Sequence, residues 1–181
     1  MKEFNLLFII LCGLIGSLTA APTEADRVAQ YLEAKHCPFL KEKWNKVVEY
    51  AKVHLPQTGT LKAKSDGYVY LKVDDNYIFS LFPMLSLQNS GYSEPPYFRA
   101  PDSPGAHINV FLADEHVQPI EIGSSFSFKL KKIVLVNPTK TTTFAILEVE
   151  APQLEQLRQK YGQTPKLHGH QFHISLARKE L

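Results

Sequence analysis

Two four-residue segments of this chain share one pattern, which is typical of a β-strand with two unlike faces. The segments are His107-Ile108-Asn109-Val110 and His173-Ile174-Ser175-Leu176. Side chains alternate between the two faces of a strand. The histidine and the small polar residue of each segment therefore share one face, and the two aliphatic residues share the other. We predict one strand over about 106–112 and a second that closes the chain, both with their apolar faces in a core.

The polar face of this pattern carries side chains suited to catalysis. Imidazole has the unperturbed pKa nearest neutrality, so one neutral and one protonated histidine can serve as general base and general acid. We therefore expect His107 and His173 to be catalytic if their strands lie side by side along one groove. Asn109 and Ser175 would bind substrate by donating hydrogen bonds to phosphoryl oxygens. Together these groups favour in-line attack at phosphorus.

A structural explanation stands beside this one. A single histidine in an apolar strand is commonly a satisfied core residue, and that explanation serves either segment taken alone. A core role explains two such segments, each with a matching polar residue, less well, so the pair favours catalysis.

The two segments resemble the signature of the 2H phosphoesterases, which is two His-h-Ser/Thr-h motifs with h hydrophobic. This superfamily includes bacterial RNA 2′,3′-cyclic phosphodiesterases, A-kinase-anchoring-protein-like phosphoesterases and viral 2′-5′ phosphodiesterases. The second segment matches the signature, whereas the first has Asn109 in place of Ser or Thr. The resemblance covers roughly Leu61 to Arg178. It implies a metal-independent phosphodiesterase without a cofactor, acting on a 2′,3′-cyclic phosphate, a 2′-5′ linked oligonucleotide or an RNA end.

The remaining patterns predict an α+β fold with two lobes. Antiparallel sheets would be flanked by helices, and the two motif strands would face a central groove. The expected helices are Thr23–Ala34, Phe39–Leu55 and one that starts at Pro152 and ends before Gly162. The expected strands are Thr60–Lys64, Gly67–Val73, Tyr77–Leu81 as a hairpin after the turn Asp74–Asn76, Phe126–Val136, and Thr141–Glu150 after the turn Asn137-Pro138.

A long loop over Ser86–Gly105 leads directly into the first motif. Loops of this length are usually functional or mobile. Its aromatic residues Tyr92, Tyr97 and Phe98 are candidate substrate-binding residues, because aromatic rings stack on nucleobases. The alternative is that these rings only anchor the loop. The basic run Lys129–Lys132 likewise allows phosphate contacts or a solvated sheet face.

The N-terminus has the pattern of a secretory signal peptide. Lys2 precedes an apolar stretch from Leu6 to Leu18, and the small residues Thr19-Ala20-Ala21 follow. We expect cleavage after Ala20, a single domain over 21–181, and a secreted or periplasmic protein. The stretch is short for a membrane span, which needs about 20 apolar residues. An uncleaved anchor is the alternative, and after cleavage we expect no stable membrane association.

Charge and cysteine content narrow the expected partners. The formal net charge is only +2, which does not indicate a duplex nucleic-acid binder but allows a nucleotide or short single-stranded RNA. Once the signal is removed, Cys37 is the only thiol, so no intramolecular disulfide can form. We expect a monomer.

Two competing interpretations remain open. His168 and His170 with His173 put three histidines in six residues, which would suit a metal site if a bulge brought them to one side. On a regular strand, however, His173 faces away from the other two, and we expect no metal. The second interpretation is a non-catalytic module that binds a nucleotide or a protein through a degenerate first motif, and Asn109 is its basis.

Overall fold

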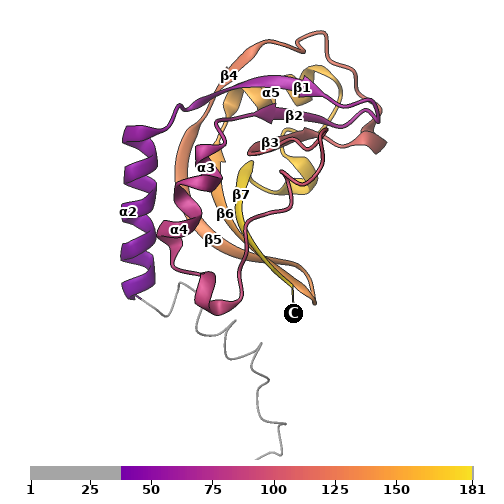
Figure 1. The fold of residues 1–181 in the computed structure, drawn as a ribbon. Helices are drawn as coiled ribbons and strands as arrows, with labels where there is room; N and C mark the ends of the chain where they lie inside the picture. The colour runs from indigo at the N-terminus through magenta and orange to yellow at the C-terminus, as the bar shows by residue number, and fades with distance from the viewer. Residues whose placement is uncertain (1–37, 181) are drawn as a thin grey trace, which may run out of the picture.

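One antiparallel sheet runs through residues 38–180, the part of the chain that the computed structural model describes (Figure 1). The strands are β1 (Thr58–Ala63), β2 (Val69–Lys72), β3 (His107–Phe111), β4 (Ser125–Ser127), β5 (Lys129–Thr139), β6 (Thr142–Glu150) and β7 (His173–Glu180). The helices are α2 (Pro38–His54), α3 (Asn76–Phe79), α4 (Leu81–Leu85) and α5 (Pro152–Lys160), with 3-10 turns η1 (Gln88–Ser90), η2 (Ala113–Glu115) and η3 (Leu167–Gly169). The spatial order of the strands is β4-β1-β2-β3-β7-β6-β5. The predicted α+β fold class is confirmed.

The sheet is curled, and its two edge strands are consecutive along the chain. β4 and β5 lie at opposite ends of the spatial order, yet only Phe128 separates them along the chain. Phe128 is buried, and its N–H donates to the carbonyl of Gln57 at 3.0 Å. The single strand predicted over 126–136 is therefore wrong in one respect. It is divided at Phe128, because β4 pairs with β1 whereas β5 pairs with β6.

The two motif strands meet at the middle of this sheet. β3 and β7 are antiparallel neighbours, and their registered pair is Ile108 with Ile174. That pair joins the group β4-β1-β2-β3 to the group β7-β6-β5. Each group supplies one motif strand, as the two-lobe prediction requires.

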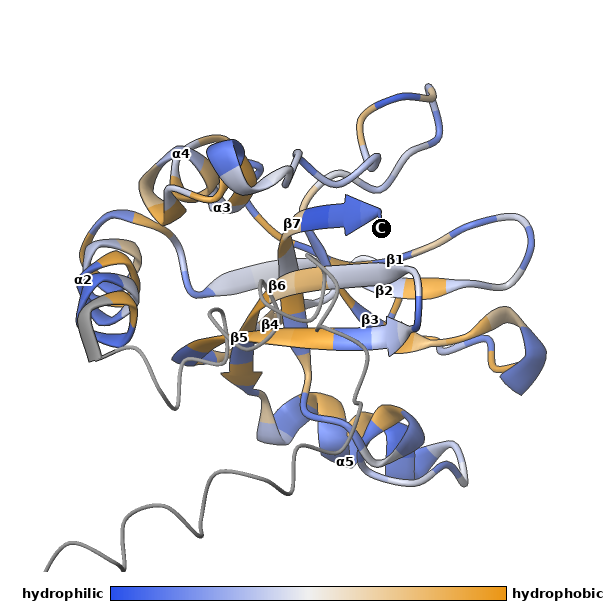
Figure 2. Ribbon diagram, turned by 90° about the horizontal axis from the view of Figure 1, so that it is seen from below, coloured by the Kyte–Doolittle hydropathy of each residue, from blue (hydrophilic) through white to orange (hydrophobic). Residues whose placement is uncertain are grey.

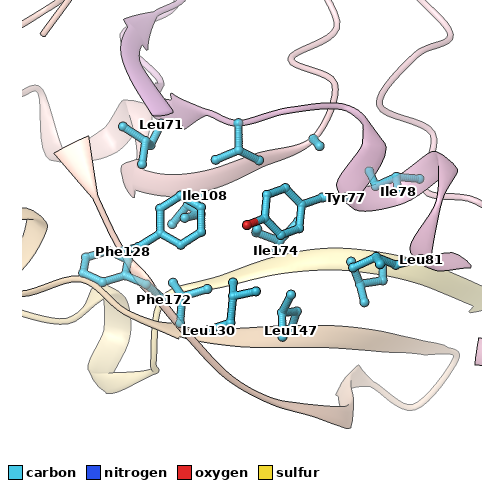
Figure 3. Packing of buried hydrophobic residues seen from close by; sticks show 14 of the residues in the cluster. Leu71, Tyr77, Ile78, Leu81, Ile108, Phe128, Leu130, Leu147, Phe172 and Ile174 are labelled. Atoms are coloured by element: carbon cyan, nitrogen blue, oxygen red, sulfur yellow. The ribbon is translucent and has the colours of Figure 1, made fainter. Parts of the chain in front are cut away.

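The core lies inside the curl and receives apolar side chains from both groups of strands. Figure 3 shows Leu71 and Ile108 from one group, Leu147 and Ile174 from the other, and Tyr77 of α3 between them. All five side chains are fully buried. Burial of this kind contributes roughly 1.5–3 kcal/mol per large aliphatic side chain, so the core fixes the faces that β3 and β7 turn outward.

Helix α2 forms where an apolar stripe predicts it, over nearly the predicted range 39–55. Trp44, Val47, Val48 and Ala51 recur at helical spacing and are all buried. Figure 2 shows apolar and polar residues alternating around α2 and α5. Helices α2, α3 and α4 gather on one side of the sheet and α5 lies apart from them (Figures 1 and 2).

The hairpin predicted for Tyr77–Leu81 is wrong, because this segment forms α3 and α4. Strand β2 pairs with β1 and β3 instead. The Asp74 carboxylate accepts from the N–H of Asn76 at 2.8 Å, a local contact that turns the chain into a helix. The buried residues then recur at i, i+1, i+4, i+5 and i+8, which is a helical spacing: Tyr77, Ile78, Leu81, Phe82 and Leu85.

The turn predicted at Asn137-Pro138 is also wrong. Both residues lie within β5, and the chain reverses between Thr139 and Thr142, which pair with each other. A register irregularity between Val136 and Thr139 accommodates the proline, which cannot donate to the ladder. The helix predicted from Pro152 is confirmed as α5, which begins at that proline and ends at Lys160, before Gly162.

Several predictions concern residues outside the described part of the chain. These are the signal peptide over 1–20, the helix over 23–34, and Cys37. Within 38–180, no helix has both the length and the apolar character that a membrane crossing requires.

Candidate active site

The polar residues of the two motifs share one face of the sheet. Neighbours of an antiparallel pair lie across from each other in reversed order. Because Ile108 lies across from Ile174, the register places His107 across from Ser175 and His173 across from Asn109. The two histidines are diagonal neighbours, a relation that corresponds to about 7–8 Å. A phosphoryl group held by both imidazoles would need a separation of this order.

Each of the two imidazoles is held by the same local contact. Nδ1 of His107 lies 2.7 Å from the carbonyl oxygen of Gly105, and Nδ1 of His173 lies 2.9 Å from that of Gln171. A carbonyl oxygen only accepts hydrogen bonds, so Nδ1 carries the proton in both rings. Nε2 is then the nitrogen that each histidine offers to a substrate. Segments far apart in sequence thus present the same ring atom.

Three tyrosine rings surround His107. The ring centroids of Tyr97, Tyr70 and Tyr68 lie 4.7, 5.7 and 6.1 Å from that of His107, each in an edge-on arrangement. Tyr68 and Tyr70 stack on each other at 5.5 Å. These rings leave His107 only 7% exposed, whereas His173 is partly exposed. The two histidines therefore have different environments.

Gly105 occupies a position that a larger residue cannot fill. Its φ is +65°, and a Cβ there would overlap the Asp75 carboxylate and the Lys72 ammonium group. Asp75 accepts hydrogen bonds from Lys72 and, at 2.8 Å, from the N–H of Ala106. This cluster fixes the backbone carbonyl that orients His107.

Burial lowers the pKa of His107 below its ordinary value of 6.5. The positive charges of Lys72 and His173 lower this pKa further. Hydrogen bonds to the Gly105 carbonyl and the Asn109 side chain act in the opposite direction but do not outweigh burial. The neutral imidazole, which can accept a proton, is therefore favoured at this position.

Asn109 is held from the side of β2. The Tyr68 hydroxyl donates a hydrogen bond to Oδ1 of Asn109. Burial raises the pKa of Tyr68 above its ordinary value of 10, and the neighbouring tyrosines and Asp66 raise it further, so this hydroxyl keeps its proton. Ser175, the matching residue of the second motif, is partly exposed on β7.

The three aromatic residues predicted to bind substrate lie in different places. Tyr97 contacts His107, and its carbonyl accepts from the N–H of Gly105 at 2.9 Å. Tyr92 is 5% exposed and packs in the core. Phe98 packs against Phe79 at 4.7 Å and is partly exposed. The structure thus brings one of the three to the motif histidines.

Three site residues on or directly before β2 were not predicted from the sequence. They are Tyr68, Tyr70 and Lys72, and the last two pair in register with Asn109 and His107. Their alternation in the segment 67–73 placed them on one face, which was the available signal. The sequence does not show that β2 pairs with β3. This pairing places the face with Tyr70 and Lys72 beside the motif residues of β3.

The basic run over 129–132 is separated from the two motif strands by β6. Lys132 lies 3.6 Å from the Glu148 carboxylate, and its side chain is 61% exposed. Glu148 pairs with His173 across the β6–β7 ladder. A carboxylate therefore lies beside the second histidine, and lysine lies beyond it.

The three histidines considered as a metal site do not gather. His168 lies in η3 with a φ of +49°, whereas His173 begins β7. No group of three or more His, Cys, Asp or Glu side chains in 38–180 is arranged to hold a metal ion.

Comparison with known proteins gives one match. A family model described as Swiss Army Knife, 2H phosphoesterase domain, matches residues 69–180, from β2 to the end of β7. Comparison with curated proteins and with solved structures found no match. The matched span includes both motif strands, the matched histidine contacts and well over half of the chain. The chain belongs to the 2H phosphoesterase family, in its Swiss Army Knife branch.

Proposed function

We propose that this protein is a metal-independent phosphodiesterase that uses His107 and His173 as its acid–base pair. Its substrate would be a 2′,3′-cyclic phosphate, a 2′-5′ linked oligonucleotide or an RNA end. The observation that carries the proposal is the identical Nδ1-to-carbonyl contact of the two histidines, which leaves both Nε2 atoms for chemistry. Family membership supports phosphodiester hydrolysis as the reaction class.

In the proposed hydrolysis of a cyclic phosphate, water attacks phosphorus from the His107 side. Nε2 of His107 takes the proton from that water as the new P–O bond forms. The bond from phosphorus to the departing ribose oxygen breaks, and Nε2 of His173 gives that oxygen a proton. The product is a phosphomonoester with a free ribose hydroxyl. The lowered pKa of His107 supports its role as the base.

Charge builds on the non-bridging oxygens during this reaction. The Asn109 amide and the Ser175 hydroxyl, one beside each histidine, would donate hydrogen bonds to these oxygens. Tyr97, beside His107, would bind the nucleoside part through its ring face, which suits a nucleotide or short single-stranded RNA. The partly exposed Phe98 would extend this contact along the loop.

A product-resolved screen tests the proposal. The full-length and 21–181 proteins would be incubated with 2′,3′-cyclic nucleotides, 2′-5′ oligoadenylates and ADP-ribose cyclic phosphate, all in EDTA. We expect phosphomonoester products from at least one class, and none from the His107→Ala/His173→Ala double variant. Loss of activity in EDTA with recovery on adding zinc would contradict a metal-independent mechanism.

We also propose export of the protein through its N-terminal segment. The apolar stretch and small residues over 6–21 support this. Sequencing the N-terminus of the protein recovered outside the cytoplasm should give Ala21 as the first residue. Recovery of the intact N-terminus in a membrane fraction would favour the uncleaved anchor.

The second candidate is a non-catalytic binding module, and Asn109 is the observation that favours it. Asn lacks the hydroxyl that the family motif supplies at this position. In this case a cyclic nucleotide would bind with measurable affinity but would be recovered intact. Binding without turnover of every substrate class in the screen would make this the better description.

A further inference from the structure

We propose that Tyr68 is a positioning residue that turns the Asn109 amide into a phosphate donor, in place of the hydroxyl usual in this motif. This inference rests on the proposed function, since it names how one phosphoryl-binding group of that site works. It also accounts for the departure of the first motif from the family pattern.

The argument begins with the chemistry of the carboxamide. A serine or threonine hydroxyl can rotate to donate to any nearby phosphate oxygen. An asparagine side chain ends in one acceptor oxygen and one donor NH₂ group, and rotation by 180° exchanges them. With Oδ1 toward an anionic phosphate the contact is repulsive. With Nδ2 toward the phosphate it donates a hydrogen bond. Asparagine can replace the hydroxyl only if something fixes this choice.

Tyr68 contributes to that control, beside the hydrogen bond that also joins the Asn109 side chain to His107. The Tyr68 hydroxyl donates to Oδ1 of Asn109, and a donor at this position would repel the NH₂ group if the amide turned over. Burial raises the pKa of Tyr68, so the hydroxyl stays protonated and remains a donor across the pH range of histidine chemistry. The oxygen end of the amide is thereby held on the Tyr68 side.

The strand order determines where the NH₂ group then points. Tyr68 directly precedes β2, and β2 and β7 lie on opposite sides of β3. With Oδ1 held toward Tyr68, Nδ2 is directed toward β7, where the register places His173 across from Asn109. That is the space where a phosphoryl group between the two histidines would lie. Tyr68 itself stays behind the amide and touches no reacting atom.

Kinetics of a hydroxyl deletion provide the first test. Tyr68→Phe keeps the stacked ring but removes the donor, so both amide orientations become available. We expect kcat to fall roughly 10- to 100-fold with a smaller change in KM, since complete loss of such a donor costs about 10²–10³. Tyr77→Phe is the matched control. It deletes a buried tyrosine hydroxyl bonded to the Pro56 carbonyl at 3.0 Å, away from the site.

A double-mutant comparison separates positioning from general damage. A serine hydroxyl at 109 does not need to be oriented by Tyr68. Tyr68→Phe should therefore have little effect on kcat in an Asn109→Ser background, although it has a large effect in the wild type. An equal loss in both backgrounds would overturn the proposal, as would full activity of the Tyr68→Phe single variant.

Inorganic phosphate provides a test that does not depend on turnover. In the wild type, nuclear Overhauser contacts should join the Asn109 NH₂ protons to the His173 ring. Added phosphate should shift these NH₂ signals, and in Tyr68→Phe it should bind more weakly. NH₂ protons close to the Tyr68 ring, or absence of phosphate binding, would overturn the inference. If phosphate binds as expected but no diester is hydrolysed, the proposed function fails while the role of Tyr68 stands.

Discussion

Nδ1 of His107 lies 2.7 Å from the carbonyl oxygen of Gly105, and this contact fixes which ring nitrogen is left without a backbone partner. A backbone carbonyl cannot change its role as an acceptor, so the imidazole keeps its proton on Nδ1 when neutral. The basic lone pair is then on Nε2. An orienting contact of this kind controls both the tautomer and the direction of the ring without a carboxylate partner.

Removal of either histidine should abolish most of the proposed activity. We expect His107→Ala and His173→Ala each to lower kcat/KM by about 10²–10⁴-fold, the usual contribution of a positioned acid or base. The double variant should be little worse than either single variant, because the two groups act as a unit. Steady-state kinetics on the best substrate, with melting temperatures as a folding control, check this. Near-normal turnover of either single variant would contradict the paired mechanism.

The dependence of kcat/KM on pH should be bell-shaped, with its acid limb displaced toward lower pH. Burial lowers the pKa of His107, so the base remains neutral at pH values below 6.5. Lys72 contributes to this lowering, and Lys72→Gln should therefore move the acid limb to higher pH. The apparent values belong to the coupled histidine pair. An acid limb that does not move in Lys72→Gln would contradict the assignment of that limb to His107.

Gly105→Ala should damage the site through its backbone. The new Cβ would overlap the Asp75 carboxylate and the Lys72 ammonium group, and φ is +65°. We expect the carbonyl to shift away from Nδ1 of His107, with a loss of kcat and a loss of about 1–3 kcal/mol in stability. Gly123→Ala is the matched control, because φ there is +90° with no atom within 4 Å of the added Cβ.

The control should lose stability through backbone strain but keep its kcat. Equal kcat losses in the two glycine variants would show that Gly105 has no specific role at the site. Denaturant unfolding and steady-state kinetics measured on the same preparations separate strain from misorientation of the ring.

The ion pair of Arg158 with Glu115 should dominate the stability of the β3 region. Arg158 is 1% exposed, and its two terminal nitrogens donate to the Glu115 carboxylate at 2.7 and 3.0 Å. Glu115→Ala leaves this guanidinium group without its anion, which should cost about 3–5 kcal/mol of the free energy of unfolding. Glu121→Ala, which breaks the more exposed pair with Lys160, should cost far less.

The Glu115 contribution should also depend on pH. Burial alone raises the pKa of Glu115, but the bonds from Arg158 and from the N–H of Leu112 together hold it below 4.5. A carboxyl with a lowered folded-state pKa stabilises the fold above 4.5 and loses this effect as the pH falls through the lower value. The stability difference between wild type and Glu115→Ala should therefore shrink in acid. A difference that stays constant down to pH 3 would contradict the ion-pair explanation.

The parts of the fold that follow from local periodicity could be predicted from the sequence. The stripe of Trp44, Val47, Val48 and Ala51 predicts α2, and the alternation in both motifs predicts the burial of their aliphatic residues: Ile108, Val110, Ile174 and Leu176. The stripe of α2 follows the helical period of 3.6 residues, and the motifs follow the strand period of two. The faces of the motif strands, and hence the candidate site itself, follow from the same rule.

The segment after β2 shows where periodicity failed. Tyr77 and Ile78 begin a short apolar run that suits a strand or a helix, and only the wider spacing to Leu85 favours the helix. The Asp74 contact to the backbone of Asn76 then favours the helix. Such contacts depend on side-chain geometry that a residue pattern does not contain.

The surroundings of His107 needed the tertiary structure. Tyr97 is ten positions away in an irregular loop, and its hydrogen bond with Gly105 brings it to the ring. Tyr92, from the same loop, enters the core instead. Composition made the two residues equivalent candidates, and only the path of the loop distinguishes them.

The Ile108–Ile174 pair gives the two motifs an approximate twofold relation, because antiparallel strands exchange places on rotation about an axis through such a pair. A phosphodiester bound in the opposite orientation would therefore have its attacking and leaving oxygens at exchanged histidines. The polarity of cleavage therefore depends on what breaks this symmetry. Within residues 38–180, tyrosine rings pack around His107 but not around His173, and Asn109 has an amide where Ser175 has a hydroxyl. The double variant Asn109→Ser/Ser175→Asn, which exchanges the two side chains between the strands, would be the smallest change that tests this. The measurement is which P–O bond of the diester is cleaved.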